Sequence, residues 1–199
     1  MRPEMDKLKY GISLFEQSLK ASNIVAIDLE TTGLKAHESD IVCVSWCTSK
    51  DDFGVTAVQH RNFRGSAYGN NDNERCVIDL LRSIHSNKEF MVVYHNAAFD
   101  LGFLLKKGWL KEEEIECTIF DTLLASYILN PAKTKEGGKH GLKSLYDELV
   151  REETDPPQPD FDSLTKNRFD FQDVRFKQAA EYAAFDAWTT LNLYQKFSL

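Results

Sequence analysis

Two acidic residues at the end of an apolar run constrain the fold of this chain more than any other feature. Residues 24–30 read Ile-Val-Ala-Ile-Asp-Leu-Glu, which is typical of a buried strand that ends in Asp28 and Glu30. Side chains alternate along a strand, so both carboxylates point to one face and Leu29 points to the other. A half-exposed strand with two solvated acids competes poorly, because no polar residue precedes Asp28 in the run. Carboxylates in apolar surroundings are costly unless cations meet them, so the pattern predicts a metal site.

The remaining apolar patterns predict an α/β protein with a mixed five-stranded sheet flanked by helices. The second and third strands are separated by a short polar turn and form a hairpin, which makes an antiparallel meander with the first. The predicted strands are 24–30, 41–49, 53–60, 90–95 and 115–120. The predicted helices are 5–20, 74–86, 100–108, 121–129, 141–150 and 173–196. We expect one domain over residues 1–199, with 1–22 as an N-terminal helical extension.

Composition excludes several classes of protein. The chain has 199 residues and a formal net charge of -7, which argues against broad neutralisation of duplex DNA. Its four cysteines form no CxxC pair and no zinc-like spacing, so we expect reduced and mostly buried thiols. The N-terminus lacks the apolar segment of a secretion signal, and no run is long enough to span a membrane. These features predict a cytoplasmic location and no membrane partner.

A third acid, Asp100, follows the predicted strand 90–95 at the start of a helix. Asn96 lies four residues before it, in His-Asn-Ala-Ala-Phe-Asp. Taken alone, Asp100 fits a simple N-cap as well as it fits a metal ligand. Asp121 has the same position before the helix 121–129, and there the cap is the preferred interpretation. His95 resembles a general base, but a local hydrogen bond at the end of its strand is the preferred interpretation.

A fourth acid, Asp186, lies on the long final helix. Tyr182 is four residues earlier and therefore on the same helix face. A tyrosine with a pKa near 10 is a poor base at neutral pH but is well suited to orient a water by hydrogen bonding. A tyrosine packed in the core would give the same spacing. The four acids together predict one site for two divalent cations, which suits the cleavage of a phosphodiester.

The three motifs, Asp-Leu-Glu, Asn-x-x-x-Asp and Tyr-x-x-x-Asp, occur in the order found in the DEDD superfamily of 3′→5′ exonucleases. The tyrosine at the fourth position before the last aspartate resembles the DEDDy branch. From Ile24 onward the chain is similar to the proofreading exonuclease domain of family A DNA polymerases, the DNA polymerase I type. That resemblance implies an RNase H-like (DnaQ-like) fold and release of nucleoside 5′-monophosphates from single-stranded or frayed DNA 3′ ends, in proofreading, replication or repair.

The resemblance also implies roles for individual residues. Asp28, Glu30, Asp100 and Asp186 would hold two Mg²⁺ or Mn²⁺ ions, and Tyr182 would position the attacking water. By the same resemblance, four residues would contact the substrate: Thr31, Leu34, Asn96 and Phe161. Leu34 matches a leucine that wedges against the terminal bases, and Phe161 matches a phenylalanine that stacks on a base.

Two features depart from that family. A family A polymerase continues into a polymerase domain, so we expect either a free-standing exonuclease or a fragment, with a polymerase domain or a separate polymerase chain as a possible partner. The stretch 131–140 is rich in lysine and is longer than the family pattern. A basic patch in and after this stretch either steers phosphates or is a solvated loop, and it comprises Lys133, Lys135, Lys139, His140 and Lys143.

Two rival functions stay open. An RNA 3′→5′ exonuclease of the RNase D type has the same DEDDy motifs. An inactive exonuclease fold that only binds nucleic acid or a protein is disfavoured, because all four acids are present.

Overall fold

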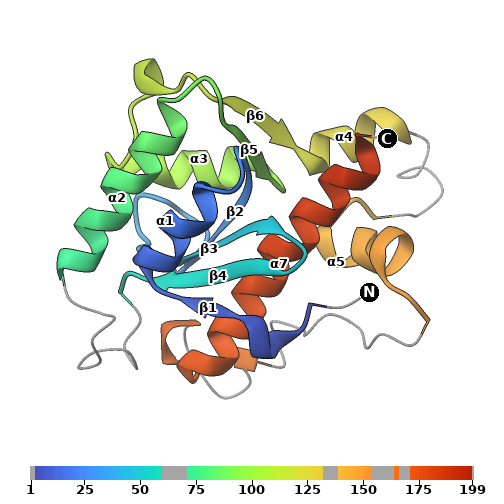
Figure 1. Ribbon diagram of the computed structural model, residues 1–199, viewed down its shortest axis with the longest axis horizontal. Coiled ribbons are helices and arrows are strands. Elements are labelled where there is room, and N and C mark those ends of the chain that lie inside the picture. Colours follow the sequence, from blue (N-terminus) through green and yellow to red (C-terminus); the bar gives the residue numbers. More distant parts are fainter. Residues whose placement is uncertain (1–2, 60–70, 132–138, 154–163, 166–170, 199) are drawn as a thin grey trace.

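A computed structural model describes residues 3–59, 71–131, 139–153, 164–165 and 171–198 of the chain, and Figure 1 shows a central sheet with helices on both sides. Among these residues there are six strands: β1 (Lys9–Tyr10), β2 (Ile24–Thr31), β3 (Ile41–Ser49), β4 (Asp52–Ala57), β5 (Met91–Tyr94) and β6 (Thr118–Asp121). The five predicted strands are all present within a few residues of their expected bounds. The sixth, β1, was not predicted.

The strand order is β1-β4-β3-β2-β5-β6, so β2 lies inside the sheet. β2, β3 and β4 pair antiparallel, whereas β5 pairs parallel with both β2 and β6. The predicted mixed sheet with an antiparallel meander is therefore confirmed. The register places Asp28 opposite Ser45 and Glu30 opposite Cys43, and a bulge follows Glu30.

The helices comprise α1 (Ile12–Leu19), α2 (Asn71–His85), α3 (Ala97–Lys106), α4 (Thr122–Leu129), α5 (Leu142–Leu145) and α7 (Phe176–Phe197). Short 3-10 turns lie at Met5–Lys7, Glu112–Glu114 and Phe171–Asp173, and a π-helical turn, η4 (Tyr146–Val150), continues directly from α5. α3 ends in a Schellman motif: Gly108 has φ +70°, and Trp109 donates its N–H to the carbonyl of Leu104 at 2.9 Å.

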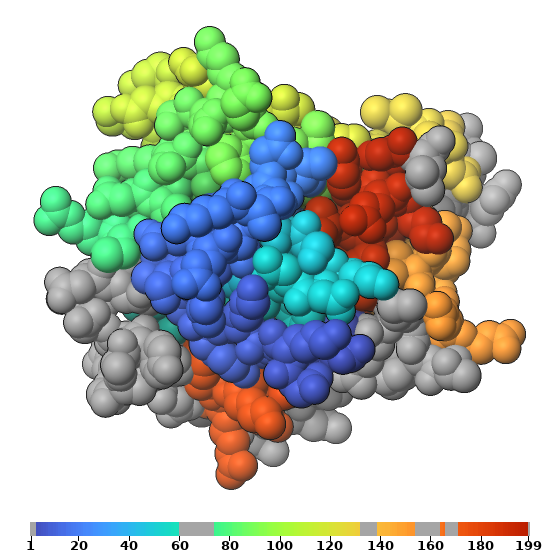
Figure 2. Space-filling model, viewed as in Figure 1, coloured from blue at the N-terminus to red at the C-terminus, as the bar shows by residue number. Residues whose placement is uncertain are grey.

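The predicted helix over residues 5–20 is wrong in its first half. β1 occupies Lys9–Tyr10 and pairs parallel with β4, and the helix starts only after Gly11, whose φ is +99°. The backbones approach closely at Gly54, where a Cβ would lie 2.6 Å from the carbonyl oxygen of Lys9. In Figure 2 the blue N-terminal segment lies directly on the cyan segment that contains β4. The apolar residues between 8 and 19 are therefore divided between a strand and the helix that follows it.

Two apolar cores lie on the two faces of the sheet. α7 covers one face with residues such as Phe185 and Trp188, whereas α1, α2 and α3 cover the other with residues such as Phe15 and Leu81. Figure 1 shows α7 (red) and α1 (blue) on opposite sides of the strands. Leu29 belongs to the core under α1, α2 and α3, so the acids on either side of it face α7, as the alternation predicts.

The thiols agree with the expectation from composition. All four cysteines are free, and three of them, Cys43, Cys47 and Cys117, are buried. Within the described ranges, we find no helix with the length and apolar character that a bilayer crossing requires.

Candidate metal centre and active site

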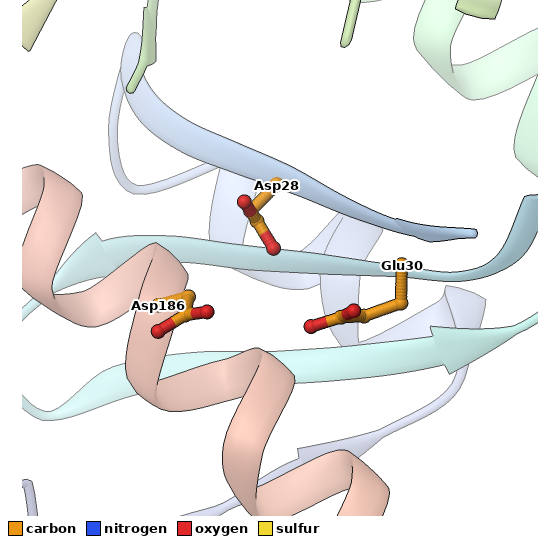
Figure 3. A group of neighbouring side chains, drawn as sticks. All are labelled: Asp28, Glu30 and Asp186. Carbon is orange, nitrogen blue, oxygen red and sulfur yellow. The ribbon is translucent and has the colours of Figure 1, made fainter. Parts of the chain in front are cut away.

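Three of the four predicted acids meet where β2 faces α7. One carboxylate oxygen from each of Asp28, Glu30 and Asp186 lies within 4.8 Å of the others. Figure 3 shows Asp28 and Glu30 extending from β2 toward Asp186, which projects from α7. Glu30 and Asp186 are each only 8% exposed, and Asp28 is half-buried. Residues 28 and 186 are far apart in sequence, and packing of α7 on the sheet brings them together.

Asp100 lies beside this group but is not one of the three. It is 2% exposed, and its Oδ1 accepts a hydrogen bond of 3.0 Å from the backbone N–H of Leu29. α3 begins at Ala97 with Asn96 at its N-cap, so Asp100 lies inside the first turn and does not cap the helix. The capping interpretation of Asp100 is therefore wrong. This bond ties the Asp100 carboxylate to the backbone of β2 at the residue between Asp28 and Glu30.

Burial and mutual repulsion disfavour the ionised forms of these acids. Burial raises the pKa of Asp28 to about 7. Burial and the charges of Asp28, Asp186 and Asp100 raise the pKa of Glu30 well above its ordinary value. The pKa of Asp186 is raised by burial and by Asp28, and the pKa of Asp100 is raised by the same two causes. Without a cation, the cluster therefore retains protons near neutral pH that isolated carboxyl groups would have lost.

Tyr182 joins the cluster through a hydrogen bond between its side chain and that of Asp186. Burial, followed by the charges of Asp186, Glu30 and Asp28, raises the pKa of the Tyr182 phenol well above its ordinary value. The phenol therefore keeps its proton at neutral pH and donates to the carboxylate. A phenol in this state is a poor base, and the expected role of Tyr182 in orienting a water stays a prediction.

Asp121 connects the starts of two helices near the site. Its Oδ1 accepts from the N–H of Leu123 at 2.8 Å, which confirms the predicted cap of α4. The same carboxylate also accepts from the N–H groups of Asn96 and Ala97, at 3.0 and 2.9 Å. Asn96 adopts the left-handed conformation with φ 70° and is exposed at the start of α3. Asp121 thus fixes the backbone from which Asn96 and Asp100 project.

His95 hydrogen-bonds locally, as expected. Its Nδ1 lies 2.9 Å from Oγ1 of Thr122, and that hydroxyl donates to the carbonyl of Tyr94. Burial lowers the pKa of His95 to about 4, so the ring is neutral at physiological pH. Both its position and its hydrogen bond favour a structural role.

The residues expected to contact substrate have different environments. Leu34 is 85% exposed just beyond the end of β2, where a large apolar side chain has little to pack against. Thr31 is half-buried and donates its hydroxyl to the carbonyl of Gly33 at 2.7 Å. Phe161 lies outside the described residues. The roles of these side chains stay predictions.

The described residues of the expected basic patch have different environments. Lys133 and Lys135 lie outside the described residues, and Lys139 is exposed. His140 is only 4% exposed: it stacks on Tyr127 at 3.9 Å and pairs with Ser126 at 2.7 Å, so its place in a solvated patch is wrong.

Lys143 lies instead on α5, beside the acids, with its Nζ 5.4 Å from the centroid of the Tyr182 ring. This position lies within the predicted helix over residues 141–150. No signal in the sequence, however, indicated that the packing of this helix would bring Lys143 to the acids.

The donor set fits a divalent cation of the Mg²⁺ or Mn²⁺ type. Such cations prefer carboxylate oxygens, and the converging acids offer only these. The raised pKa values of the acids have the same implication, because a cation at this point would restore the ionised forms. The site therefore has both the ligands and the charge imbalance that such an ion would satisfy.

Comparisons with known proteins agree with this geometry. A family model described as 3′-5′ exonuclease matches residues 10–199. DNA polymerase I of Rhizobium leguminosarum is 29% identical over 190 residues, which cover 88% of this chain and 18% of that polymerase. The chain spans between 17% and 20% of the length of four such DNA polymerase I chains.

Solved structures share the fold. RNase D of Escherichia coli superposes with a TM-score of 0.63 at 15% identity, over 96% of this chain and 44% of RNase D. NrnC of Brucella melitensis with bound Mg²⁺ gives a TM-score of 0.54 at 20% identity, over 89% of this chain and 72% of NrnC. The expected RNase H-like fold is thereby confirmed. The match over residues 10–199 shows that the chain belongs to the 3′-5′ exonuclease family.

Proposed function

We propose that this chain is a 3′→5′ exonuclease that uses two divalent cations, Mg²⁺ or Mn²⁺, to release nucleoside 5′-monophosphates from single-stranded or frayed DNA 3′ ends. The observation that carries the proposal is the convergence of acids from separate motifs on one point between β2 and α7. Membership of the 3′-5′ exonuclease family supports the same reaction.

DNA is the preferred substrate because the relatives matched in sequence are DNA polymerases. RNA is the second candidate. E. coli RNase D has the same fold and is described as an exoribonuclease involved in structured RNA processing, although it is only 15% identical to this chain. The 2′-hydroxyl distinguishes the two substrates chemically.

The protein groups would divide the work as follows. Asp28, Glu30, Asp100 and Asp186 would hold the cations. When bound, the cations supply a water of lowered pKa and stabilise the charge that develops on the phosphate and the leaving 3′ oxygen. Tyr182 would orient the attacking water with the hydroxyl that now donates to Asp186. No covalent intermediate on the protein is needed.

The substrate end would be held mainly by apolar contacts. The exposed side chain of Leu34 suits a wedge against the terminal base. Thr31, Asn96 and Phe161 are proposed as further contacts on the strength of the family resemblance. Recognition by stacking predicts little preference for sequence.

The cellular setting is also a proposal. We propose a polymerase domain or a separate polymerase chain as its partner, because the polymerases that match are about five times as long as this chain. The free, mostly buried cysteines support a cytoplasmic location. A single domain over residues 1–199 stays a prediction.

The test uses matched DNA and RNA oligonucleotides, single-stranded and 5′-labelled, incubated with the chain and either Mg²⁺ or Mn²⁺. We expect stepwise shortening of DNA from the 3′ end, release of nucleoside 5′-monophosphates and slower loss of RNA. Asp186→Asn is the matched control, because it removes one ligand charge with little change of shape. Faster degradation of RNA would favour the RNase D type of activity, and no shortening of either substrate would contradict the proposal.

A further inference from the structure

Lys143 is a cationic side chain near the acids, and the proposed mechanism gives it no role. Its Nζ lies over the ring of Tyr182, 5.4 Å from the centroid, which is within the range of a cation–π contact. Its positive charge lowers the pKa values of both Glu30 and Asp186, against the effect of burial. Lys143 is therefore electrostatically close to two of the acids and in contact with the phenol.

The backbone that carries Lys143 is well anchored. The next turn of the chain buries Leu145 and Tyr146, and the Tyr146 ring packs edge-on against Phe185 at 5.1 Å. Phe185 directly precedes Asp186 on α7. Packing thus fixes α5 relative to the helix that bears Tyr182 and Asp186, and the half-buried lysine chain extends from that fixed point.

A cavity of about 300 Å³ opens between these elements. Four consecutive residues at the start of α5, including Lys143, line one side, and Tyr182 and Asp186 line the other. That volume lies at the lower end of the range of small-ligand sites. Lys143 therefore borders open space next to the acids.

We propose that Lys143 is a substrate-binding residue of the exonuclease site, whose ammonium group contacts a non-bridging oxygen of the scissile phosphate in this cavity. The inference rests on the proposed function. Four carboxylates and two divalent cations have no net charge, so the phosphate and the negative charge added during attack need a further cation. Lys143 would supply this positive charge from the side of the site where Tyr182 lies, because its ammonium group lies over the Tyr182 ring.

A simpler role is that Lys143 only neutralises the acids when no cation is bound. The two roles predict different effects on phosphate binding. If Lys143 is only a counter-ion, then its removal strengthens binding of Mn²⁺ and leaves binding of a phosphate unchanged. If it contacts the phosphate, then its removal weakens phosphate binding even when Mn²⁺ is saturating.

The test is calorimetric titration of the full chain with Mn²⁺ alone and then, in saturating Mn²⁺, with thymidine 5′-monophosphate. Lys143→Met keeps the length of the side chain and removes its charge, and Lys143→Arg keeps the charge. Lys177→Met is the matched control, since Lys177 lies on α7 with 81% of its side chain exposed. We expect Lys143→Met to weaken binding of the monophosphate roughly 10- to 100-fold without weakening Mn²⁺ binding, and we expect Lys143→Arg to restore most of it.

Three outcomes would overturn the inference: unchanged monophosphate binding in Lys143→Met, an equal loss in Lys177→Met, or no rescue by Lys143→Arg. If Lys143→Met loses Mn²⁺ binding as well, monophosphate binding is compared between Lys143→Arg and wild type instead. Weak binding by Lys143→Arg would then overturn the inference, and binding close to that of wild type would support it. Shortening of oligonucleotides by the wild-type chain tests the proposed function separately. Active wild type with fully active Lys143→Met contradicts only the role of Lys143.

Discussion

The two faces of β2 differ sharply in chemistry although alternate residues of one strand build them. On one face, Val25, Ile27 and Leu29 belong to an apolar core under α1, α2 and α3. On the other, Asp28 and Glu30 face α7 beside further acids. Burial stabilises the first set of side chains, whereas burial and mutual repulsion disfavour the charged forms of the second. The comparison indicates that the apolar face supplies stability and the acidic face holds the proposed chemistry at a cost to stability.

The largest expected effect is on activity, from Asp28→Ala on the acidic face. Loss of a central ligand should reduce cleavage of labelled DNA by about a thousandfold or more. The free energy of unfolding of the metal-free chain at pH 7.5 should stay equal or rise, because one of several repelling acids is removed. Urea unfolding measures it. Normal cleavage by the folded variant would refute the metal assignment of Asp28.

The substitution of the neighbouring residue, Leu29→Ala, should lower stability more than activity. Leu29 is 4% exposed, so truncation leaves a cavity and should lower the free energy of unfolding by about 2–5 kcal/mol. Activity at low temperature should change far less than in Asp28→Ala, although the shared strand couples the two faces. A variant as stable as wild type would show that this face does not carry the stability.

A smaller effect is expected from Tyr182→Phe, which removes only a hydroxyl that donates to Asp186. Cleavage should slow roughly 10- to 100-fold, the value of a hydrogen bond to a charged group. Titration with Mn²⁺ should give nearly wild-type affinity, because the carboxylates are all retained. Unchanged turnover would remove Tyr182 from the mechanism.

The pH dependence of stability should also distinguish the two faces. Asp28 has an ordinary value of 3.8 and a folded-state pKa of about 7, and the pKa values of its acidic neighbours are raised too. The folded chain therefore binds more protons than the unfolded chain in this window, so stability falls as pH rises from about 4 to about 7. Calorimetry in EDTA should give a melting temperature several degrees lower near pH 7 than near pH 4.

The melting temperature at pH 7 should recover when Mn²⁺ replaces EDTA. In Asp28→Ala the decline with pH should be smaller. Stability that rises with pH over the same window would contradict the raised pKa values.

The sequence predicted local features well and contacts between elements less well. The alternation around Leu29 placed Asp28 and Glu30 on one face, and the cap at Asp121 followed from residue type alone. β1 could not be predicted, because two residues become a strand only by pairing with β4. The burial of His140 against Tyr127 depends in the same way on how distant segments pack.

The central claim is that the four acids form one site that divalent cations complete. Calorimetric titration of the wild-type chain with Mn²⁺ at pH 7.5 tests it most directly, with Asp186→Asn as the comparison. The account predicts two ions per chain and weaker binding at one or both positions in the variant. Absence of Mn²⁺ binding to the folded wild-type chain, or equal binding by both proteins, would contradict it.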